Sequence, residues 1–472
     1  MNARAALERF FLKGLDSVDP EKAVSRALRF RGTSLELGRT RLNLKRVRRI
    51  CALGAGKAAT GMLRGLITAL PRPIDAGLII TNEIAAVQPA STAAPPLCKG
   101  RLGGVEPSGL STSPTPSLQR RGGVRIMLAG HPVPDRNGLA AARKLLDLAA
   151  SAGPDDLAFV LISGGASAMT PAPAPGLSLA DIRKTTRLLL VSGAPIHEVN
   201  IVRRRLSRIA GGQLARVLFP AASITLLLSD VIGDDLEAIG SGPTVPDPST
   251  FQDAWDVLSR LDLLSKVPHP VLVHLRAGKM GLVSETPKPR DPVFKSARTA
   301  IVASNRTMLD AAAKAAREEG LSAEILTDAL QGEARDVGAI LADLALVRSR
   351  VCRRPLILLA GGETTVRVHG KGTGGRNQEM ALAFADRIRG IEGITALFAG
   401  TDGKDGNSAS AGGWADGGTA ALGERARGVS IARVLAANNS TPFLRAAKDL
   451  FVTGPTGTNV RDVVMIRMGK AR

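Results

Sequence analysis

The chain has 472 residues, a length that favours two or three domains over a single core. Hydrophobic residues make up 44% of it, whereas aromatic residues make up only 3% and Tyr is absent, which argues against a nucleic-acid module built on stacked rings. The net charge of +21 comes from Arg residues scattered from end to end. A solvated, Arg-rich surface is the simplest interpretation, and a field that attracts phosphates and carboxylates is the alternative.

Other features of the whole sequence point to the cytoplasm. The chain has three cysteines, Cys51, Cys98 and Cys352, whose spacing predicts neither a disulfide framework nor a zinc site. It contains no run of about 18 apolar residues, and charges within the helical pattern at its start distinguish that segment from a signal peptide. We therefore expect a cytoplasmic protein, a monomer or a homodimer, with no membrane or nucleic-acid partner.

From residue 5 onward the hydrophobic pattern predicts helices and strands in alternation. Helical spacing covers residues 5–30, and a strand at 49–53 then leads through a glycine turn into a helix at 58–70. The later strands of this region are expected at 76–80, 125–129, 157–162 and 224–228, with helices at 178–193 and 199–218. Such alternation is typical of mainly parallel sheets flanked by helices, so we predict an α/β fold.

Two stretches interrupt this alternation. Residues 85–123 are rich in Pro, Ser, Thr and Gly, and we expect them to form a disordered insertion. Residues 276–297 are poorly patterned. The pattern then restarts, with strands expected at 300–303, 323–327, 355–359 and 395–399 and helices at 306–319, 333–349 and 377–390. We therefore place a domain boundary after residue 295, which gives one α/β domain at 1–295 and a second at 296–472.

The turn after the first strand of this fold reads Gly-Ala-Gly-Lys at residues 54–57. It is not a P-loop, because Cys51 and Ala58 stand where that motif needs Gly and Ser or Thr. The turn does fit the Gly-x-Gly-x-x-Gly/Ala pattern of dinucleotide sites, with Ala59 as its last member. Lys57 at the start of a helix could meet a phosphate, although a tight turn with an exposed lysine would give the same sequence.

Turns of small and acidic residues follow two further strands. Residues 163–165 read Ser-Gly-Gly, and their backbone amides could cradle an anion, although a close-packed turn is the simpler interpretation. Residues 229–235 carry three carboxylates, Asp230, Asp234 and Asp235, whose oxygens suit Mg²⁺. Asp234 or Asp235 could instead cap a helix. Because parallel sheets bind ligands at the carboxyl ends of their strands, the recurrence of these turns indicates a ligand site.

The second region carries similar motifs. A Gly-rich loop at 370–375 leads into a helix that begins with Arg376 and Asn377. This is a plausible phosphate clamp, because Arg can pair with two oxygens at once. Another strand leads into Gly-Thr-Asp-Gly at 400–403, where Asp402 could orient or deprotonate a substrate hydroxyl.

Together these stretches resemble the glycerate kinase family with a C-terminal MOFRL domain. The matching motifs keep the family's order over nearly the whole chain outside 85–123, and they begin at Gly54, Gly130, Ser163, Ser229, Gly240, Gly361, Gly374, Gly400 and Thr453. The resemblance implies a glycerate kinase-like α/β domain at 1–295 and a MOFRL α/β domain at 296–472, with the active site in the cleft between them. It also implies ATP, Mg²⁺ and the phosphorylation of D-glycerate to 2-phosphoglycerate.

The resemblance extends to individual residues. Lys57 looks like the family's catalytic lysine, Arg376 is similar in role, and we add Asp402 to the expected catalytic set. Asp230 and Asp234 are the expected metal ligands. Nucleotide or substrate contacts are expected from Gly54, Gly56, His131, Ser163, Gly164, Gly165, Glu363, Gly374, Gly375, Asn377 and Asn459.

Three positions depart from the family's pattern. Ala409 stands where the family usually has a further Asp, Arg205 where it has His, and Ala210 where it has Lys. If the missing carboxylate holds metal or substrate in the family, the change at Ala409 would reduce activity here.

Two other functions stay open at this point. An NAD(P)H-dependent hydroxypyruvate reductase would use the dinucleotide-like turn at 54–59, but hydride transfer would not explain three separate Asp clusters. A non-catalytic protein that binds anions or nucleic acid is supported only by the net charge of +21.

Overall fold

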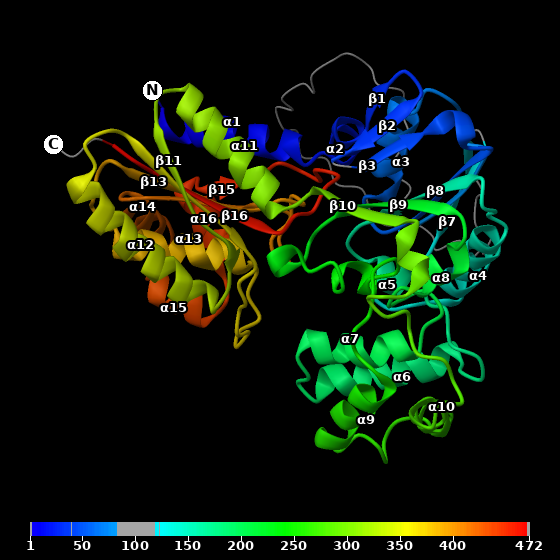
Figure 1. Ribbon diagram of the computed structural model, residues 1–472. Helices are drawn as coiled ribbons and strands as arrows, with labels where there is room; N and C mark the ends of the chain where they lie inside the picture. The colour runs from blue at the N-terminus through cyan, green and yellow to red at the C-terminus, as the bar shows by residue number, and fades with distance from the viewer. Residues whose placement is uncertain (1, 39, 83–118, 122, 470–472) are drawn as a thin grey trace, which may run out of the picture.

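Each half of the chain contributes one large sheet (Figure 1). The computed structural model describes residues 2–38, 40–82, 119–121 and 123–469. Among these residues the first sheet has the strand order β10-β9-β8-β4-β5-β7-β6. The strands are β4 (Arg49–Ala55), β5 (Ala76–Thr81), β6 (Gln119–Arg121), β7 (Val124–Leu128), β8 (Asp156–Ile162), β9 (Ala222–Leu228) and β10 (Ala297–Ala303). All neighbours run parallel except β7 and β6.

Helices cover both faces of the first sheet, as the alternating side chains of its strands require. Ile50 and Ala52 of β4 face one core, with α3 (Ala59–Ala69) and α2 (Pro20–Ala27). Cys51 and Leu53 face the other core, with α4 (Arg136–Ala150) and α8 (Gln213–Leu218). A small antiparallel sheet of β1 (Arg29–Arg31), β2 (Ser34–Leu37) and β3 (Thr40–Asn43) follows α2.

The second sheet has the order β11-β12-β16-β13-β14-β15 among the described residues. Its strands are β11 (Ser322–Leu330), β12 (Leu356–Gly362), β13 (Ile394–Gly400), β14 (Gly412–Asp416), β15 (Leu450–Phe451) and β16 (Asp462–Met468). Its pairing is mixed: β11 and β12 are parallel, whereas the last long strand, β16, lies antiparallel between β12 and β13. The covering helices are α11 (Asn305–Glu318), α12 (Ala334–Val351), α13 (Arg376–Arg387), α14 (Thr419–Arg427), α15 (Ile431–Ala436) and α16 (Ser440–Ala447).

The first helix of the chain belongs to the second sheet. α1 (Ala3–Ser17) lies beside α11 on one face of that sheet (Figure 1). The ring of Phe11 packs edge-on against Phe451 of β15, with 5.2 Å between the ring centroids. The hydroxyl of Thr458 donates a hydrogen bond to the carbonyl oxygen of Val18 at 2.9 Å. The N-terminal segment therefore joins the two halves.

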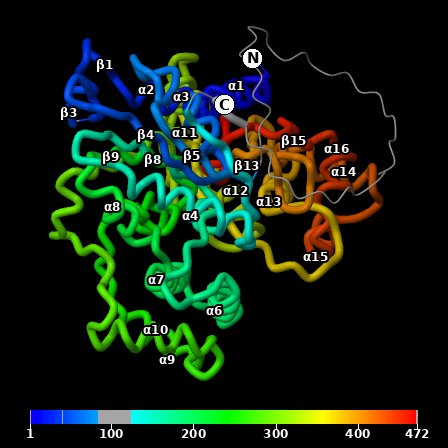
Figure 2. Tube along the Cα trace, turned by 90° about the vertical axis from the view of Figure 1, so that its right-hand side faces the viewer, coloured from blue at the N-terminus to red at the C-terminus, as the bar shows by residue number. Residues whose placement is uncertain are grey.

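Four helices form a separate group with its own apolar core. They are α6 (Leu179–Val191), α7 (Ile196–Arg205), α9 (Phe251–Arg260) and α10 (His269–Lys279). In both views the group lies below the first sheet, joined to it through the region of the short helix α5 (Ala166–Met169) and α8 (Figure 1, Figure 2). Two of its helices start at capping boxes, Ser178 with Asp181 and Thr250 with Asp253, which satisfy free N–H groups there.

The α/β fold class is confirmed, although the second sheet is mainly antiparallel where mainly parallel sheets were expected. Three further details differ from the sequence prediction. The expected helix at 199–218 is split into α7 and α8, because Gly211 and Gly212 have φ values of +61° and +78°, which a helix cannot accommodate. The division expected after 295 precedes β10, which extends the first sheet, so the change of sheet comes after Ala303. Most of the expected insertion at 85–123 lies outside the described residues, but its end forms β6.

Candidate active site

Three turns come together at the carboxyl ends of neighbouring strands. β9, β8 and β4 are adjacent in the first sheet, so the turns that follow them lie side by side. The Lys57 N–H donates a hydrogen bond to the Gly164 carbonyl oxygen at 3.0 Å. The Ala58 N–H donates to the hydroxyl oxygen of Ser163, also at 3.0 Å. The turns after β4 and β8, identified separately in the sequence, are thus bonded to each other.

The glycines of these turns are needed because neighbouring groups approach them closely. A Cβ at Gly56 would lie 2.3 Å from Ser163 Oγ, and the φ of +127° at this residue favours glycine as well. A Cβ at Gly54 would lie 2.7 Å from a side chain of β5. At Gly164 it would lie 2.1 Å from Asp230 Oδ2. Close packing between turns therefore accounts for the Gly-x-Gly pattern, and it sets the Asp230 carboxylate against the turn after β8.

A cavity of about 900 Å³ lies beside these turns. Four of the predicted residues line it: His131, Gly164, Gly165 and Asp230. Its other walls come from α6, α7 and the segment that ends at Ser241, so every lining residue belongs to the first half of the chain. Ligand cavities for molecules of nucleotide size fall in this range of volume.

Several cations of this region have no partner among the described residues: Lys57, and the cavity-lining Arg183, Lys184, Arg187 and Arg203. Lys57 is exposed, and its side chain makes no hydrogen bond or ion pair with any described residue. Arg203 of α7 lines the cavity and is also unpaired, and burial lowers the pKa of its guanidinium. Burial, and then the charge of Lys57, lowers the pKa of the His131 imidazole below 6.5, which leaves this side chain neutral near pH 7. Unpaired cations beside a cavity favour an anionic ligand.

Arg203 is a candidate that the sequence prediction missed. In the sequence, Arg203, Arg204 and Arg205 form one short basic run. Successive residues of a helix point about 100° apart, so α7 directs Arg203 to the cavity and buries the other two. The helical period is therefore the sequence signal that distinguishes Arg203 from Arg204 and Arg205.

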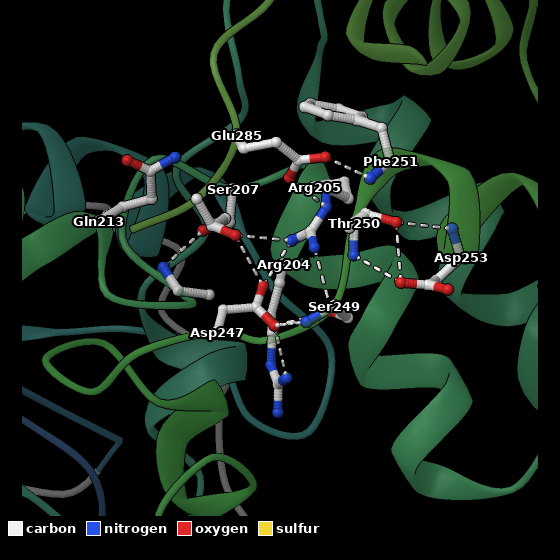
Figure 3. A network of polar contacts seen from close by, with 12 residues as sticks. Arg204, Arg205, Ser207, Gln213, Asp247, Ser249, Thr250, Phe251, Asp253 and Glu285 are labelled. Atoms are coloured by element: carbon white, nitrogen blue, oxygen red, sulfur yellow. Dashed lines mark hydrogen bonds and ion pairs between the residues drawn. The ribbon is translucent and has the colours of Figure 1, made fainter. Parts of the chain in front are cut away.

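Arg204 and Arg205 form a buried network around Asp247 (Figure 3). The Asp247 carboxylate accepts hydrogen bonds from Arg204 at 3.0 Å, from Arg205 at 2.5 Å and from the Thr286 hydroxyl at 3.0 Å. Burial alone would raise the pKa of Asp247, but Arg205 and the other donors hold it below its ordinary value. The Arg205 guanidinium also lies over the ring of Phe251, 5.5 Å from its centroid. Arg205, which stands where the family has His, is thus part of the packing of the helical group.

In the second half, Arg376 begins α13 and is held by two carboxylates. Its Nε and Nη2 donate to Asp462 at 2.5 and 3.2 Å, and its Nη1 donates to Glu363 at 2.7 Å. Burial raises the pKa of Asp462 to about 6; Arg376 opposes this shift and Asp405 adds to it. The predicted pair Glu363 and Arg376 is therefore brought together, with Asp462 as a partner that the sequence prediction missed.

The Gly-rich loop before α13 is fixed by its neighbours. The Gly374 N–H donates to Asn407 Oδ1 at 2.8 Å. A Cβ at Gly375 would lie 2.4 Å from the Asp405 carboxyl. The Asn377 N–H donates to Asp405 Oδ1 at 3.0 Å, and its side-chain amide donates to Asp405 as well. Asn377 is buried, and its side-chain amide also donates to Asp462 Oδ1 at 2.9 Å, whereas its own Oδ1 has no hydrogen-bond partner within the described residues.

Asp402 and Asn459 lie in loops of the second half and do not line the cavity. Asp402 is partly exposed, and its Oδ1 accepts a hydrogen bond from the Lys404 N–H at 3.0 Å. Asn459 Oδ1 accepts from the Arg461 N–H at 2.9 Å. Both side chains therefore support the shape of their own loops.

Charged groups from both halves affect the pKa of Asp230. Burial raises the pKa of this carboxyl, and Glu363 of the second half raises it further, whereas Lys57 and Arg461 lower it. Charges from both halves therefore lie close enough to one another to interact. The Asp230 carboxyl therefore lies within electrostatic range of charged groups from both halves.

Asp230 and Asp234 have the chemistry of a Mg²⁺ site that is completed by a ligand. No group of three His, Cys, Asp or Glu side chains suited to a metal occurs within the described residues. Mg²⁺, however, is often held by one or two carboxylates together with substrate phosphates. Within the described residues Asp234 Oδ1 is buried and has no hydrogen-bond partner, so this oxygen is available to a cation. The two carboxylates therefore fit the metal that the sequence predicts.

The other departures from the family pattern lie in different surroundings. Ala409 is exposed and is not among the residues that line the cavity. Ala210 does line the cavity, so a Lys there would add a further cation to a wall that already carries Arg183, Lys184, Arg187 and Arg203.

Comparisons with known proteins cover both halves. Residues 6–276 match a family described as a domain of unknown function, DUF4147, and residues 356–462 match the MOFRL family. A "Glycerate 2-kinase" of Pyrococcus horikoshii is 42% identical over 72% of this chain and 77% of its own length. The crystal structure of a glycerate kinase from Thermotoga maritima superposes with a TM-score of 0.81 at 33% identity, covering 98% of this chain and 99% of that one. A protein of Agrobacterium vitis, provisionally named hydroxypyruvate reductase, is 38% identical over 89% of this chain and 100% of its own length. In the part of the chain that the structure describes, no helix is both long and apolar enough to span a bilayer.

Proposed function

The chain belongs to the glycerate kinase family with a MOFRL segment, and from this premise we propose that it transfers the terminal phosphoryl group of ATP to D-glycerate and releases 2-phosphoglycerate. One observation carries the proposal. The turns bearing Lys57, Gly164 and Asp230 meet beside a cavity of about 900 Å³ whose nearby cations are unpaired. Glycerate and the phosphates of ATP are both anions, so the charge of this site matches both substrates.

In this proposal the two substrates contact different parts of the cavity. The glycerate carboxylate pairs with Arg203, whose planar guanidinium can hold two oxygens at once. The N–H groups of Gly164 and Gly165 make no hydrogen bond to another described residue and can donate to phosphate oxygens. Neutral His131 accepts a hydrogen bond from a glycerate hydroxyl and so orients it.

The residues that assist phosphoryl transfer are Lys57, Arg376, Asp230, Asp234 and Asp402. Lys57 and Arg376 neutralise charge on the transferring group, which is spread over its equatorial oxygens. Asp230 and Asp234 would hold Mg²⁺, which when bound neutralises charge between the phosphates. Closure of the two halves on the bound substrates would exclude water from the phosphoryl donor. We propose that Asp402 reaches the acceptor hydroxyl in this closed state.

The direct test is turnover of D-glycerate with ATP and Mg²⁺, with the product identified by phosphorus NMR. Formation of 2-phosphoglycerate supports the proposal in full. Formation of 3-phosphoglycerate would retain the kinase and correct the position of transfer. A folded protein that phosphorylates neither hydroxyl would refute the proposal.

Hydroxypyruvate reduction is the second candidate, because a relative carries that name and the turn at 54–59 fits a dinucleotide pattern. Packing against Ser163 already explains Gly56, so that pattern gives little independent support. NADH oxidation by hydroxypyruvate without ATP separates the two functions. Reduction at a rate comparable to glycerate phosphorylation would favour the reductase.

Replacing Arg203 by Met is expected to raise the KM for D-glycerate by about 10- to 100-fold with a small change in kcat. The reason is that Arg203 binds a carboxylate that does not react, so ground state and transition state lose the same contact. Arg208→Met is the matched control, because Arg208 is exposed and does not line the cavity. A normal KM in Arg203→Met would exclude this residue from the carboxylate contact.

Turnover is expected to fall as the pH drops below about 6, the pKa of Asp462. Below that pH the carboxyl is protonated and no longer forms an ion pair with Arg376. The guanidinium of Arg376, which we propose assists phosphoryl transfer, is then held less rigidly. Stability has the opposite sign: a folded-state pKa above the ordinary 3.8 favours folding at low pH, and this contribution is lost as the pH rises through about 6. The kcat–pH profile of Asp462→Asn checks the assignment, because that variant should have a lower plateau and no acid limb near 6. An unchanged acid limb would assign it to another group.

A further inference from the structure

Arg461 is a buried cation that no described residue satisfies. Only 4% of its surface is exposed, yet its Nε and Nη1 have no hydrogen-bond partner, and it forms no ion pair within the described residues. Arg205 is buried to the same degree, at 2%, and its guanidinium donates to Asp247 and Thr286. Arg205 leaves only its Nε without a hydrogen bond, whereas no side-chain donor of Arg461 is hydrogen-bonded within the described residues.

The backbone of Arg461 is held in a conformation that L-residues seldom adopt. Its φ is +73°, in the left-handed region. The Asn459 side chain accepts from its N–H at 2.9 Å, and its carbonyl oxygen accepts from the Thr401 N–H at 3.0 Å. Left-handed geometry in a non-glycine residue persists only where the surroundings enforce it, and such residues cluster at ligand sites. These two hydrogen bonds fix the direction in which the side chain leaves the loop.

The guanidinium lies among carboxylates of both halves. Burial lowers its pKa, and Asp234, Glu363, Asp230 and Asp328 oppose that shift, in decreasing order. None of the four comes within ion-pair distance of it. Asp230 and Asp234 are the carboxylates that fit Mg²⁺, and Asp230 also feels the charge of Lys57. The next residue in the chain, Asp462, accepts hydrogen bonds from Arg376 at 2.5 and 3.2 Å, so the loop that carries Arg461 lies beside the expected catalytic arginine.

We propose that Arg461 is a further phosphate-binding residue, whose guanidinium donates to the terminal phosphates of the nucleotide from the second half of the chain. The inference rests on the proposed function. It fits the chemistry of the side chain, because a guanidinium is always charged and its fork of N–H groups matches phosphate oxygens. The second half would then contribute Arg461 as well as Arg376, and the first half Lys57. A phosphate group would satisfy the donors that the protein leaves free.

The test is calorimetric binding of three probes in the presence of Mg²⁺: a non-hydrolysable ATP analogue with an imido bridge, ADP and AMP. Arg461→Asn is the main variant, because Asn tolerates left-handed backbone. It should weaken binding of the ATP analogue by about 10- to 100-fold, weaken ADP less and leave AMP unchanged. Arg461→Lys keeps the charge without the fork and should show a smaller loss. Arg290→Asn, in an exposed loop, is the matched control.

The outcomes separate this inference from the proposed function. Equal affinities of wild type and Arg461→Asn for the ATP analogue would overturn the role of Arg461 and leave the kinase proposal standing. Losses of equal size for all three probes would also overturn it, because a merely structural role does not depend on the number of phosphates. A wild-type protein that binds none of the probes would overturn both. If Arg461→Asn does not fold, Arg461→Lys decides the question by the same comparison.

Discussion

Lys57→Ala is expected to lower kcat for ATP-dependent phosphorylation of D-glycerate by about 10³-fold, with a much smaller change in the KM for either substrate. Lys57 stands at the end of β4, where α3 begins without a side-chain cap, so its ammonium adds to the free N–H groups of that helix start. Negative charge on the transferring phosphoryl group is most dispersed in the transition state. A positioned cation therefore stabilises the transition state more than the bound substrates.

The fold of this variant should be intact. The hydrogen bond that joins the β4 turn to Gly164 comes from the backbone N–H of residue 57, which Ala retains. The side chain is exposed and unpaired among the described residues, so its removal leaves no buried group without a partner. Lys144→Ala, on the exposed side of α4, is the matched control and should have wild-type kinetics. Near-normal turnover in Lys57→Ala would remove this lysine from the mechanism.

Arg205→Met is expected to lower the free energy of unfolding by roughly 3 kcal/mol, the largest stability effect that the structure suggests for a single side chain. The side chains of Arg205 and Asp247 are both fully buried and lie 2.5 Å apart. Removing the guanidinium leaves the Asp247 carboxylate with Arg204 as its remaining charged partner, and it leaves the Thr286 hydroxyl without its contact to the guanidinium. Methionine restores most of the volume over Phe251, so the loss is mainly electrostatic.

Chemical denaturation measures this effect, with Arg208→Met as the control, because that exposed residue should change stability by less than about 0.5 kcal/mol. Turnover per folded molecule should stay near wild type at low temperature, since Arg205 does not line the cavity. Arg205→His introduces the residue expected of the family and tests whether an imidazole can donate a hydrogen bond to the Asp247 carboxylate in place of the guanidinium. If Arg205→Met were as stable as wild type, Arg204 alone would suffice for Asp247.

The sequence predicted those features that depend on local pattern. Apolar runs such as that of β8 and the glycine turns beside them are visible in any short window, so most strands and the turn at Lys57 were predicted correctly. Pairing between distant strands is not local: nothing near residue 462 indicates that β16 lies between β12 and β13, or that β10 completes the first sheet. Arg203 and Arg461 were missed because the sequence does not distinguish an unpaired arginine beside a cavity or inside a loop from an arginine in solvent. Only its surroundings distinguish the two.

The position of α1 has a consequence for the order in which the molecule can be assembled. During synthesis the apolar side of α1, which includes Phe10 and Phe11, leaves the ribosome long before its partner Phe451. Val18 and Thr458, whose hydrogen bond closes this contact, are 440 residues apart in the chain. Vectorial folding from the N-terminus can therefore build the first sheet but cannot bury α1. Part of the apolar side of α1 stays uncovered until β15 is in place, so a translation product interrupted before Phe451 would expose apolar surface that the finished protein buries.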